Sequence, residues 1–295
     1  MSHTENTPLL EVRNLKKYFG KKDRVLHAVD DISFKIGKGK TMGVVGESGC
    51  GKSTLGRTII HLLESTDGQI FLNGEDITRV DRKKMHEINE KMQIVFQDPY
   101  SSLNPRQTVE EIIKEPLKLS GRYKKRAELD EKTEELMRLV GIDERLRLAY
   151  PHELDGGRRQ RVGIARALAL SPDFIVCDEP VSALDVSIQA QIINLFKHLQ
   201  TKHQFSFLFI AHDLAIVRYI SDKIGVLYHG KLVEVAPTEE LFENPIHPYT
   251  KSLLSAVPTP DPRKEKNKVL VPFDGTSFTG QGEMKKISPE HFVLV

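Results

Sequence analysis

The sequence predicts an α/β fold in which helices cover both faces of a parallel sheet. Two features carry this prediction. Apolar runs of strand length alternate with segments of helical periodicity, and a glycine-rich loop joins one apolar run to the helix after it. With 295 residues, 39% of them hydrophobic and 28% charged, the chain has the size and composition of one large globular domain or two modest ones.

The N-terminal part is predicted to be mainly β-structure with one helix. The helix is placed at residues 53–63, because Leu55, Ile59, Leu62 and Leu63 fall on one face. An Asn-Gly pair predicts a turn close to the end of this part. The predicted strands are residues 9–19, 26–36, 41–46 and 68–77.

Charged segments of helical periodicity follow, and they predict a helical insertion over about residues 98–165. We place a first domain at residues 1–245 and a C-terminal extension at 246–295, whose tail after about residue 264 is open to disorder. The remaining predicted elements are strands at 92–98, 173–179 and 205–213, a helix at 187–200 with the apolar stripe Ile188, Ile192, Leu195, Phe196 and Leu199, and a hairpin at 222–236 around His229 and Gly230.

Composition excludes several classes of protein. The formal net charge of +2 is too small to indicate a nucleic-acid partner. Cys50 and Cys177 have no spacing typical of a disulfide framework or a zinc site. The N-terminus lacks the pattern of a signal peptide, and the apolar runs are too short to span a membrane.

A phosphate-binding loop is predicted at GESGCGKST, which fits G-x-x-x-x-G-K-[ST] between a strand and a helix. Glycines let backbone N–H groups curl around phosphate oxygens, and the helix directs its positive dipole end at them. Lys52 adds a charge for the β- and γ-phosphates, and the Ser53 hydroxyl is a ligand for Mg²⁺. The predicted binding set is Gly46, Glu47, Ser48, Gly49, Cys50, Gly51, Lys52, Ser53 and Thr54.

Two carboxylates follow the buried strand in FIVCDEP. A parallel strand delivers its C-terminal residues to the edge of the sheet where ligands bind. Asp178 is therefore a candidate Mg²⁺ ligand, and Glu179 a candidate base for an attacking water. By itself the pair would fit a solvated acidic turn equally well, and the phosphate loop makes the functional interpretation the stronger one.

With these motifs the chain resembles the ATP-binding cassette (ABC) family over about residues 9–260. The resemblance implies a RecA-like P-loop NTPase core with an antiparallel β subdomain and an inserted α-helical subdomain. It adds further motifs in the family's order: Gln97 in FQDP as the glutamine loop, LDGGRRQ at 154–160 as the family signature, SALD at 182–185 as the loop ending in Asp185, and His212 in IAHD as the switch histidine.

The resemblance also implies roles for these residues. Two subunits sandwich two ATP molecules with Mg²⁺, and each nucleotide lies between the phosphate loop of one subunit and the signature of the other. Gln97 would contact metal or water and relay to a transmembrane partner, and His212 would contact the γ-phosphate. The catalytic residues would be Glu179, His212 and Gln97. An aromatic residue near the N-terminus would stack on adenine: Phe19 aligns best, and Tyr18 is the near alternative.

Two stretches are similar to the ATPase subunits of oligopeptide and dipeptide importers, a group that includes nickel importers. They are FQDPYSSLNPRQTV and NPIHPYTKSLLSAVPTPDP. This similarity implies a second ATPase subunit, often a different chain, two transmembrane permease subunits and an extracytoplasmic peptide-binding protein. It places the chain peripherally on the cytoplasmic face of the cell membrane. Members of the group often carry cysteines for an iron–sulfur centre in the C-terminal extension. The segment after Ala256 has no cysteine, so we expect no iron–sulfur cluster.

The signature departs from the family's usual Ser-Gly-Gly, since Asp155 precedes Gly156 and Gly157. An ionised carboxylate cannot donate a hydrogen bond to phosphate. About 4 Å from a phosphate charge it would be repelled by on the order of 4 kcal/mol at an effective dielectric near 20. Arg158 and Arg159 are candidates to compensate, and Asp155 is equally suited to cap the helix that follows it.

Two alternatives to an importer ATPase remain. One is a nucleotide-binding partner subunit with one degenerate composite site, because Asp155 replaces serine. The other is an ABC ATPase or regulator without a role in transport. The transported cargo and the choice between a homodimer and a heterodimer lie outside what the sequence decides.

Overall fold

The computed structural model describes residues 7–21, 24–257, 268–275, 278 and 280–295. The chain divides into two units, which are described separately. The first unit contains residues 1–78 and 208–295, and the second unit contains residues 79–207.

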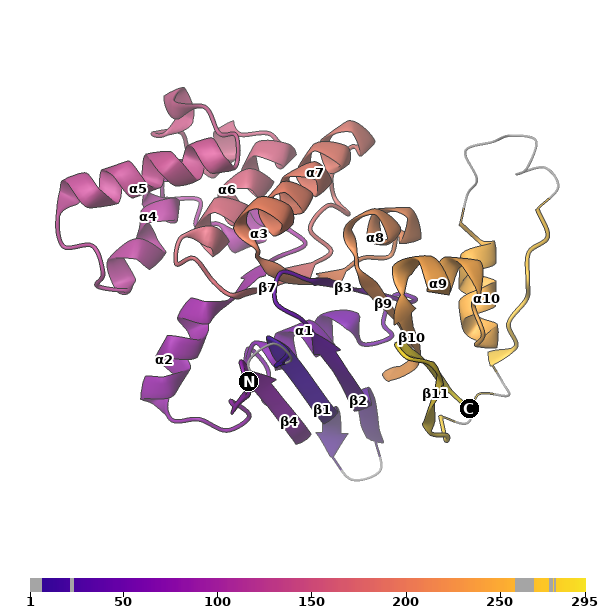
Figure 1. The fold of residues 1–295 in the computed structure, drawn as a ribbon. Helices are drawn as coiled ribbons and strands as arrows, with labels where there is room; N and C mark the ends of the chain where they lie inside the picture. Colours follow the sequence, from indigo (N-terminus) through magenta and orange to yellow (C-terminus); the bar gives the residue numbers. More distant parts are fainter. Residues whose placement is uncertain (1–6, 22–23, 258–267, 276–277, 279) are drawn as a thin grey trace, which may run out of the picture. The chain divides into compact units, whose positions relative to one another are not determined.

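The N-terminal part of the first unit is a four-stranded antiparallel sheet with the order β2-β1-β4-β5 (Figure 1). Several of its apolar side chains are fully buried, among them Leu10, Leu15, Ile32 and Ile70. The strands are β1 (Leu10–Lys21), β2 (Arg24–Ile36), β4 (Asp67–Leu72) and β5 (Glu75–Asp76). The predicted strand and turn at 68–77 is thus confirmed as the pair β4–β5.

A second group of strands in the first unit has the order β11-β12-β10-β9-β3. Strand β3 is parallel to β9, and the pairs from β9 to β11 are antiparallel. The hairpin predicted at 222–236 is confirmed as β9–β10 with its turn at His229 and Gly230. The strands are β3 (Thr41–Val45), β9 (Lys223–Tyr228), β10 (Lys231–Pro237), β11 (Met284–Ser288) and β12 (His291–Leu294).

Four helices complete the described part of the first unit: α1 (Lys52–Ile59), α8 (Leu214–Ile220), α9 (Thr238–Glu243) and α10 (Pro248–Ser255). Helix α1 ends four residues before the predicted boundary, and Leu62, expected on its apolar face, is 55% exposed. His61 takes a positive φ of 60°, a conformation that does not continue a right-handed helix.

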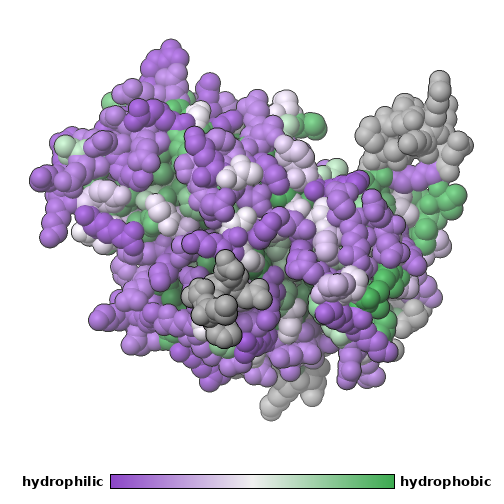
Figure 2. Space-filling model, in the orientation of Figure 1, coloured by the Kyte–Doolittle hydropathy of each residue, from purple (hydrophilic) through white to green (hydrophobic). Residues whose placement is uncertain are grey.

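The end of the chain forms a hairpin, although the sequence left its tail open to disorder. Strand β12 pairs with β10, and β11 pairs with β12. An apolar patch of three exposed residues, Val269, Leu270 and Val271, precedes the hairpin. Figure 2 shows apolar colour over this C-terminal segment and a mainly hydrophilic surface elsewhere on the same face.

The second unit is mainly helical and contains one parallel pair of strands, β6 (Met92–Val95) and β7 (Phe174–Asp178). The chain passes from this unit into the first within strand β8 (Ser206–Ile210). The helices are α2 (Arg82–Lys91), α3 (Pro99–Ser102), α4 (Val109–Leu119), α5 (Arg126–Leu139), α6 (Gly156–Leu168) and α7 (Val186–His203), with short 3₁₀ helices at Glu144–Leu146 and Pro151–Glu153.

Helices α3 to α6 occupy the region of the predicted helical insertion. Helix α6 continues three residues beyond the predicted end at residue 165. Helix α2 was missed, because seven of its ten residues are charged or histidine and it buries only Ile88. Helix α7 confirms the predicted stripe: Ile192, Leu195, Phe196 and Leu199 are buried, and Ile188 is half-buried near the start of the helix.

Candidate nucleotide-binding site

The predicted phosphate loop joins β3 to α1 and is closely packed at two of its glycines. Gly46 and Gly51 have φ angles of +152° and +108°. A Cβ at Gly46 would lie 2.1 Å from the carbonyl oxygen of Leu227, and one at Gly51 would lie 1.9 Å from that of Ala28. No other residue type fits these positions without moving the backbone, so the glycines fix the path of the loop.

Lys52 lies inside the loop, although it is a charged residue. It is 4% exposed, and its Nζ donates to the carbonyl oxygens of Gly46 and Glu47, both at 2.8 Å. A buried ammonium needs such partners, and here they come from the loop itself. The helix that follows starts without a side-chain cap, and the start of a helix favours an anion.

The open side of the loop has the space that a phosphate group requires. Glu47, Ser48 and Gly49 are exposed, and a Cβ at Gly49 would meet no atom within 4 Å. Cys50 faces inward, and burial raises the pKa of its thiol, so it is a packed residue rather than a nucleophile. An exposed stretch of backbone beside a lysine charge fits a polyphosphate.

Tyr249 is a contact of the loop that sequence reasoning missed. Its phenol oxygen accepts a hydrogen bond from the backbone N–H of Glu47 at 3.1 Å. Tyr249 belongs to the NPIHPYT segment, which in the sequence indicated only a similarity to oligopeptide and dipeptide importers. The distance of 202 residues between the two partners hides the contact from any local pattern.

The two candidates for stacking on adenine have different surroundings. Tyr18 donates its hydroxyl to Asp30 at 2.5 Å and stacks on His27 with ring centroids 4.0 Å apart. Phe19 is 38% exposed. Both residues lie in β1, opposite the part of β2 that leads to Ala28 beside the loop. Of the two side chains that of Phe19 is the more exposed, and Lys17 Nζ lies over its ring, 4.9 Å from the centroid.

His212 follows β8 and precedes helix α8. The helix is capped by Asp213, whose carboxylate accepts from the N–H of Ala215 at 2.8 Å, and His212 is exposed. The N–H of Ala211 donates to the carbonyl of Val44 at 3.3 Å. His212 thus leaves its strand beside the end of β3, from which the phosphate loop starts.

The second unit brings two of the predicted catalytic residues together. Gln97 Nε2 donates to Glu179 Oε2 at 2.9 Å. Glu179 takes a φ of +48°, which is unusual for a residue with a Cβ, and Asp178 before it is buried at 1% exposure. The two carboxylates of FIVCDEP therefore differ in position. Asp178 lies at the buried end of β7, and Glu179 contacts Gln97 of the glutamine loop.

Asp155 is the N-cap of α6. Its Oδ1 accepts from the N–H of Arg158 at 2.7 Å, and its Oδ2 lies 3.4 Å from Arg158 Nε. Of the two arginines considered as compensators, Arg158 is the one beside Asp155, whereas the guanidinium of Arg159 lies over the ring of Tyr100. Asp155 therefore caps α6 and pairs with the Arg158 guanidinium at the same time. A serine at this position would still provide an oxygen for the helix cap.

The signature glycines are packed against the start of α7. A Cβ at Gly157 would lie 2.6 Å from Cγ2 of Ile188, and one at Gly156 would lie 3.1 Å from Leu184. Asp185 is the N-cap residue of α7, but its exposed side chain makes no capping hydrogen bond. The signature and Asp185 therefore belong to one packed region of the second unit.

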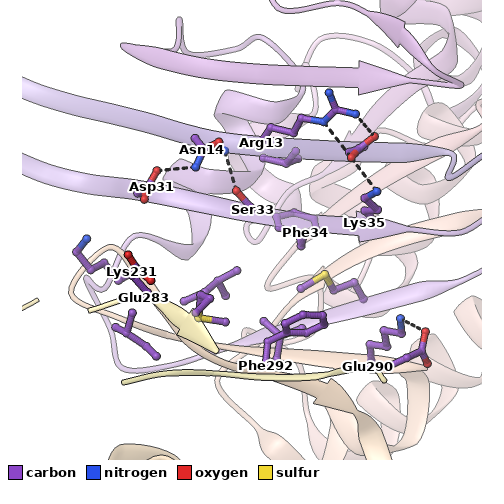
Figure 3. A pocket seen from close by; sticks show the side chains of 18 of the residues that line it. Arg13, Asn14, Asp31, Ser33, Phe34, Lys35, Lys231, Glu283, Glu290 and Phe292 are labelled. Atoms are coloured by element: carbon purple, nitrogen blue, oxygen red, sulfur yellow. Dashed lines mark hydrogen bonds and ion pairs between the residues drawn. The ribbon is translucent and has the colours of Figure 1, made fainter. Parts of the chain in front are cut away.

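A pocket of about 710 Å³ lies elsewhere in the first unit, between strands β1 and β2 and the C-terminal strands (Figure 3). Glu11 binds both Arg13 and Lys35 at 2.9 Å, and Lys223 binds Glu290 at 2.6 Å. These charges neutralise one another at its rim. None of the predicted site residues lines this pocket.

The fold and the phosphate loop define a P-loop ATPase of the ATP-binding-cassette type. A solved dimeric post-hydrolysis state of the ATP-binding cassette MJ0796, bound to ADP and Pi, matches with a TM-score of 0.71 and 26% identity, over 78% of this chain and 98% of that one. The structure of cbiO1 from Clostridium perfringens, part of the ABC transporter complex cbiONQ, matches with a TM-score of 0.72 and 26% identity, over 81% and 92%. The RecA-like α/β fold predicted from the motifs is confirmed.

The chain belongs to the ABC transporter family, whose model matches residues 29–182. The model described as the C-terminal region of oligopeptide/dipeptide transporters matches residues 233–275. The chain is 54% identical to the oligopeptide transport ATP-binding protein OppF of Bacillus subtilis, over 97% of this chain and 95% of that protein. It is 47% identical to the dipeptide transport ATP-binding protein DppF of Lactococcus lactis, over 99% and 95%. Among the described residues, no helix has the length and apolarity needed to cross a membrane.

Proposed function

We propose that this chain is an ATP-hydrolysing subunit that powers the import of oligopeptides or dipeptides through a membrane ABC transporter. The observation that carries the proposal is the presence in one chain of a tightly packed phosphate loop and of a C-terminal region of the oligopeptide/dipeptide transporter type. Relatives named for oligopeptide and dipeptide transport match nearly the whole chain and support the cargo class.

In this proposal the phosphates and the base of the nucleotide contact residues of the first unit. Lys52 and the N–H groups of the loop bind the β- and γ-phosphates, and Phe19 stacks on adenine. The hydroxyl of Ser53, the carboxylate of Asp178 and the amide oxygen of Gln97 fit the oxygen ligands that Mg²⁺ prefers. When bound, Mg²⁺ supplies positive charge that offsets the charge on the phosphate oxygens.

The chemical step is hydrolysis by a water molecule. Glu179 accepts the proton of that water on a carboxylate oxygen, and Gln97 orients the carboxylate through its 2.9 Å hydrogen bond. His212 contacts the γ-phosphate and orients the water. These roles agree with the exposure of His212 and with the position of Glu179 at the end of β7.

The assembly in this proposal contains a second ATPase subunit of different sequence, two permease subunits and an extracytoplasmic peptide-binding protein. The chain lies on the cytoplasmic face of the membrane. The partner's nucleotide site is completed by Asp155, Gly156, Gly157 and Asp185. Because the carboxylate of Asp155 repels a phosphate group in that site, hydrolysis takes place mainly at this chain's own phosphate loop. The C-terminal extension holds no iron–sulfur cluster, because no cysteine follows Ala256; iron and sulfide analysis of the purified protein tests this.

A second candidate function is a nucleotide-binding partner subunit that contributes little turnover itself, in an assembly with one degenerate composite site at Asp155. Reconstitution distinguishes the candidates. Proteoliposomes containing the permeases, both ATPases and the binding protein are expected to accumulate labelled oligopeptide with ATP. The Glu179→Gln variant of this chain is expected to stop accumulation. Undiminished transport by that variant would support the second candidate, and uptake of Ni²⁺ without peptide uptake would overturn the cargo assignment.

A further inference from the structure

The phosphate loop is held at Glu47 from two directions. Lys52 Nζ donates to the carbonyl oxygen of Glu47 at 2.8 Å, and the N–H of Glu47 donates to Tyr249 Oη at 3.1 Å. The first contact lies within the loop, whereas the second comes from α10 in the C-terminal extension. The extension therefore reaches the loop through the phenol group of Tyr249.

Tyr249 is itself fixed in place. It is 2% exposed, and its ring packs against Tyr228 and Phe273, with centroid distances of 4.4 and 5.3 Å. Burial is also the main cause that raises the pKa of its hydroxyl. The phenol is therefore neutral and able to accept from an N–H group, and its ring has no room to turn away from the loop.

The backbone around Tyr249 is held by a buried carboxylate. Glu234 in β10 is fully buried, and its two oxygens accept from the N–H groups of Ile246 and His247 at 2.8 and 2.9 Å. His247 Nδ1 then accepts from the N–H of Tyr249 at 3.1 Å and caps α10. These contacts set the position at which α10 begins, and with it the position of the phenol.

The last strand of the chain completes this arrangement. His291 in β12 is fully buried, and its Nε2 lies 2.8 Å from Glu234 Oε1 while its Nδ1 lies 3.0 Å from Glu240 Oε1. A buried carboxylate is costly unless its oxygens are hydrogen-bonded, and His291 with the two N–H groups meets that need. A continuous set of hydrogen bonds thus runs from the terminal hairpin to the phosphate loop.

We propose that Tyr249 is a positioning residue for the phosphate loop, through which the C-terminal extension sets the affinity for nucleotide. The inference rests on the proposed function, because it assumes that the loop binds a nucleotide. Tyr249 does not touch the reacting atoms in this proposal; it fixes Glu47, and Glu47 fixes the path of the loop between Gly46 and Lys52. Substitution should therefore raise KM for ATP and leave kcat nearly unchanged.

The test uses the full chain, with Mg²⁺ and ADP as the probe in calorimetric titration. Tyr249→Phe keeps the ring and removes only the acceptor. One hydrogen bond corresponds to a factor of about 2 to 10 in an equilibrium constant at 25 °C, so the Kd should rise by that factor. Hydrogen exchange should accelerate in the nucleotide-free protein at the segment containing Glu47, and not at α1.

Tyr228→Phe is the matched control, because it removes a phenol oxygen from the same aromatic cluster. Among the described residues, Tyr228 makes no side-chain hydrogen bond to the loop, so its Kd and its exchange at Glu47 should match the wild-type protein. An unchanged Kd for Tyr249→Phe, an equal rise for both variants, or unchanged exchange at Glu47 would overturn the inference. Failure of the wild-type protein to bind ADP would instead count against the proposed function.

Discussion

Gln97 Nε2 donates a hydrogen bond to Glu179 Oε2 over 2.9 Å, so the amide of one predicted site residue fixes the carboxylate of another. The backbone of Glu179 is equally constrained. Its φ is +48°, and its carbonyl accepts from the N–H and the hydroxyl of Ser182 at 3.3 and 3.1 Å. A left-handed conformation costs a residue with a Cβ about 1–2 kcal/mol. Placing this carboxylate in the turn after β7 therefore lowers the free energy of unfolding, and such strained residues are common at functional sites.

The first prediction concerns Glu179 as the base. Glu179→Gln should lower ATP turnover at least about 100-fold, because an amide cannot accept the proton, while ADP affinity stays within about a factor of two. Gln97→Ala should lower turnover less, by about 10-fold, since the carboxylate remains but is no longer oriented. Phosphate release by the assembled transporter measures both. Glu131→Gln, an exposed carboxylate of α5, is the control and should have no effect.

The second prediction separates Phe19 from Tyr18. Stacking of an aromatic ring on a base is worth about 1–3 kcal/mol, so Phe19→Ala should weaken ADP binding roughly 5- to 100-fold. Binding of inorganic pyrophosphate, which has no base, should not change. Tyr18→Phe should leave ADP affinity intact and lower the free energy of unfolding by about 1 kcal/mol, because it removes the hydrogen bond to Asp30. Because Tyr18→Phe keeps an aromatic ring, Tyr18→Ala is the variant that decides the role: weaker ADP binding by Tyr18→Ala with unchanged binding by Phe19→Ala would assign the stacking role to Tyr18.

The third prediction concerns Asp155. Asp155→Ala should destabilise the chain by about 1 kcal/mol through loss of the N-cap of α6, whereas Asp155→Ser keeps a capping oxygen and should cost only a few tenths. Denaturant unfolding of the isolated chain measures this difference. In the assembled transporter, Asp155→Ser should raise ATP turnover, since a hydroxyl can donate to the partner's nucleotide. Unchanged turnover would show that the charge is already compensated by Arg158.

The fourth prediction concerns acid stability of the helical part. Glu110 in α4 contacts Lys114 and Arg147, and the hydrogen bond from Arg147 is the main cause that lowers the pKa of its carboxyl. Because the folded pKa lies below the unfolded value of about 4.3, the stabilisation is present above that pH and is lost as the pH falls through the folded pKa. Glu110→Gln should cost about 1–3 kcal/mol at pH 7 and much less at pH 3.

Urea unfolding at pH 7 and pH 3 checks this fourth prediction. The exposed Glu128 of α5 provides the control, and Glu128→Gln should change stability little at either pH. A difference between Glu110→Gln and wild type that stays constant across the two pH values would contradict the ionic explanation and would point to packing instead.

Much of the site could be predicted from the sequence because its parts are local. The phosphate loop, the carboxylates after β7 and the cap at Asp155 each depend on residues within a few positions of one another, and their backbone requirements appear directly as glycine, apolar runs and capping side chains. The helix at 187–200 was predicted for the same reason. Helix α2 was not, because its stability does not depend on a wide apolar face that periodicity would reveal.

The sequence by itself therefore determined the class of the protein, and it predicted the residues of the phosphate loop and the order of the motifs. Only the tertiary structure decided that Gln97 holds Glu179, that Tyr249 holds Glu47 and that the tail returns as β11 and β12 beside β10. The physical reason is distance along the chain. Glycine conformations and helix caps act over a few residues, whereas a hydrogen bond between partners 82 or 202 residues apart exists only after the intervening chain has packed.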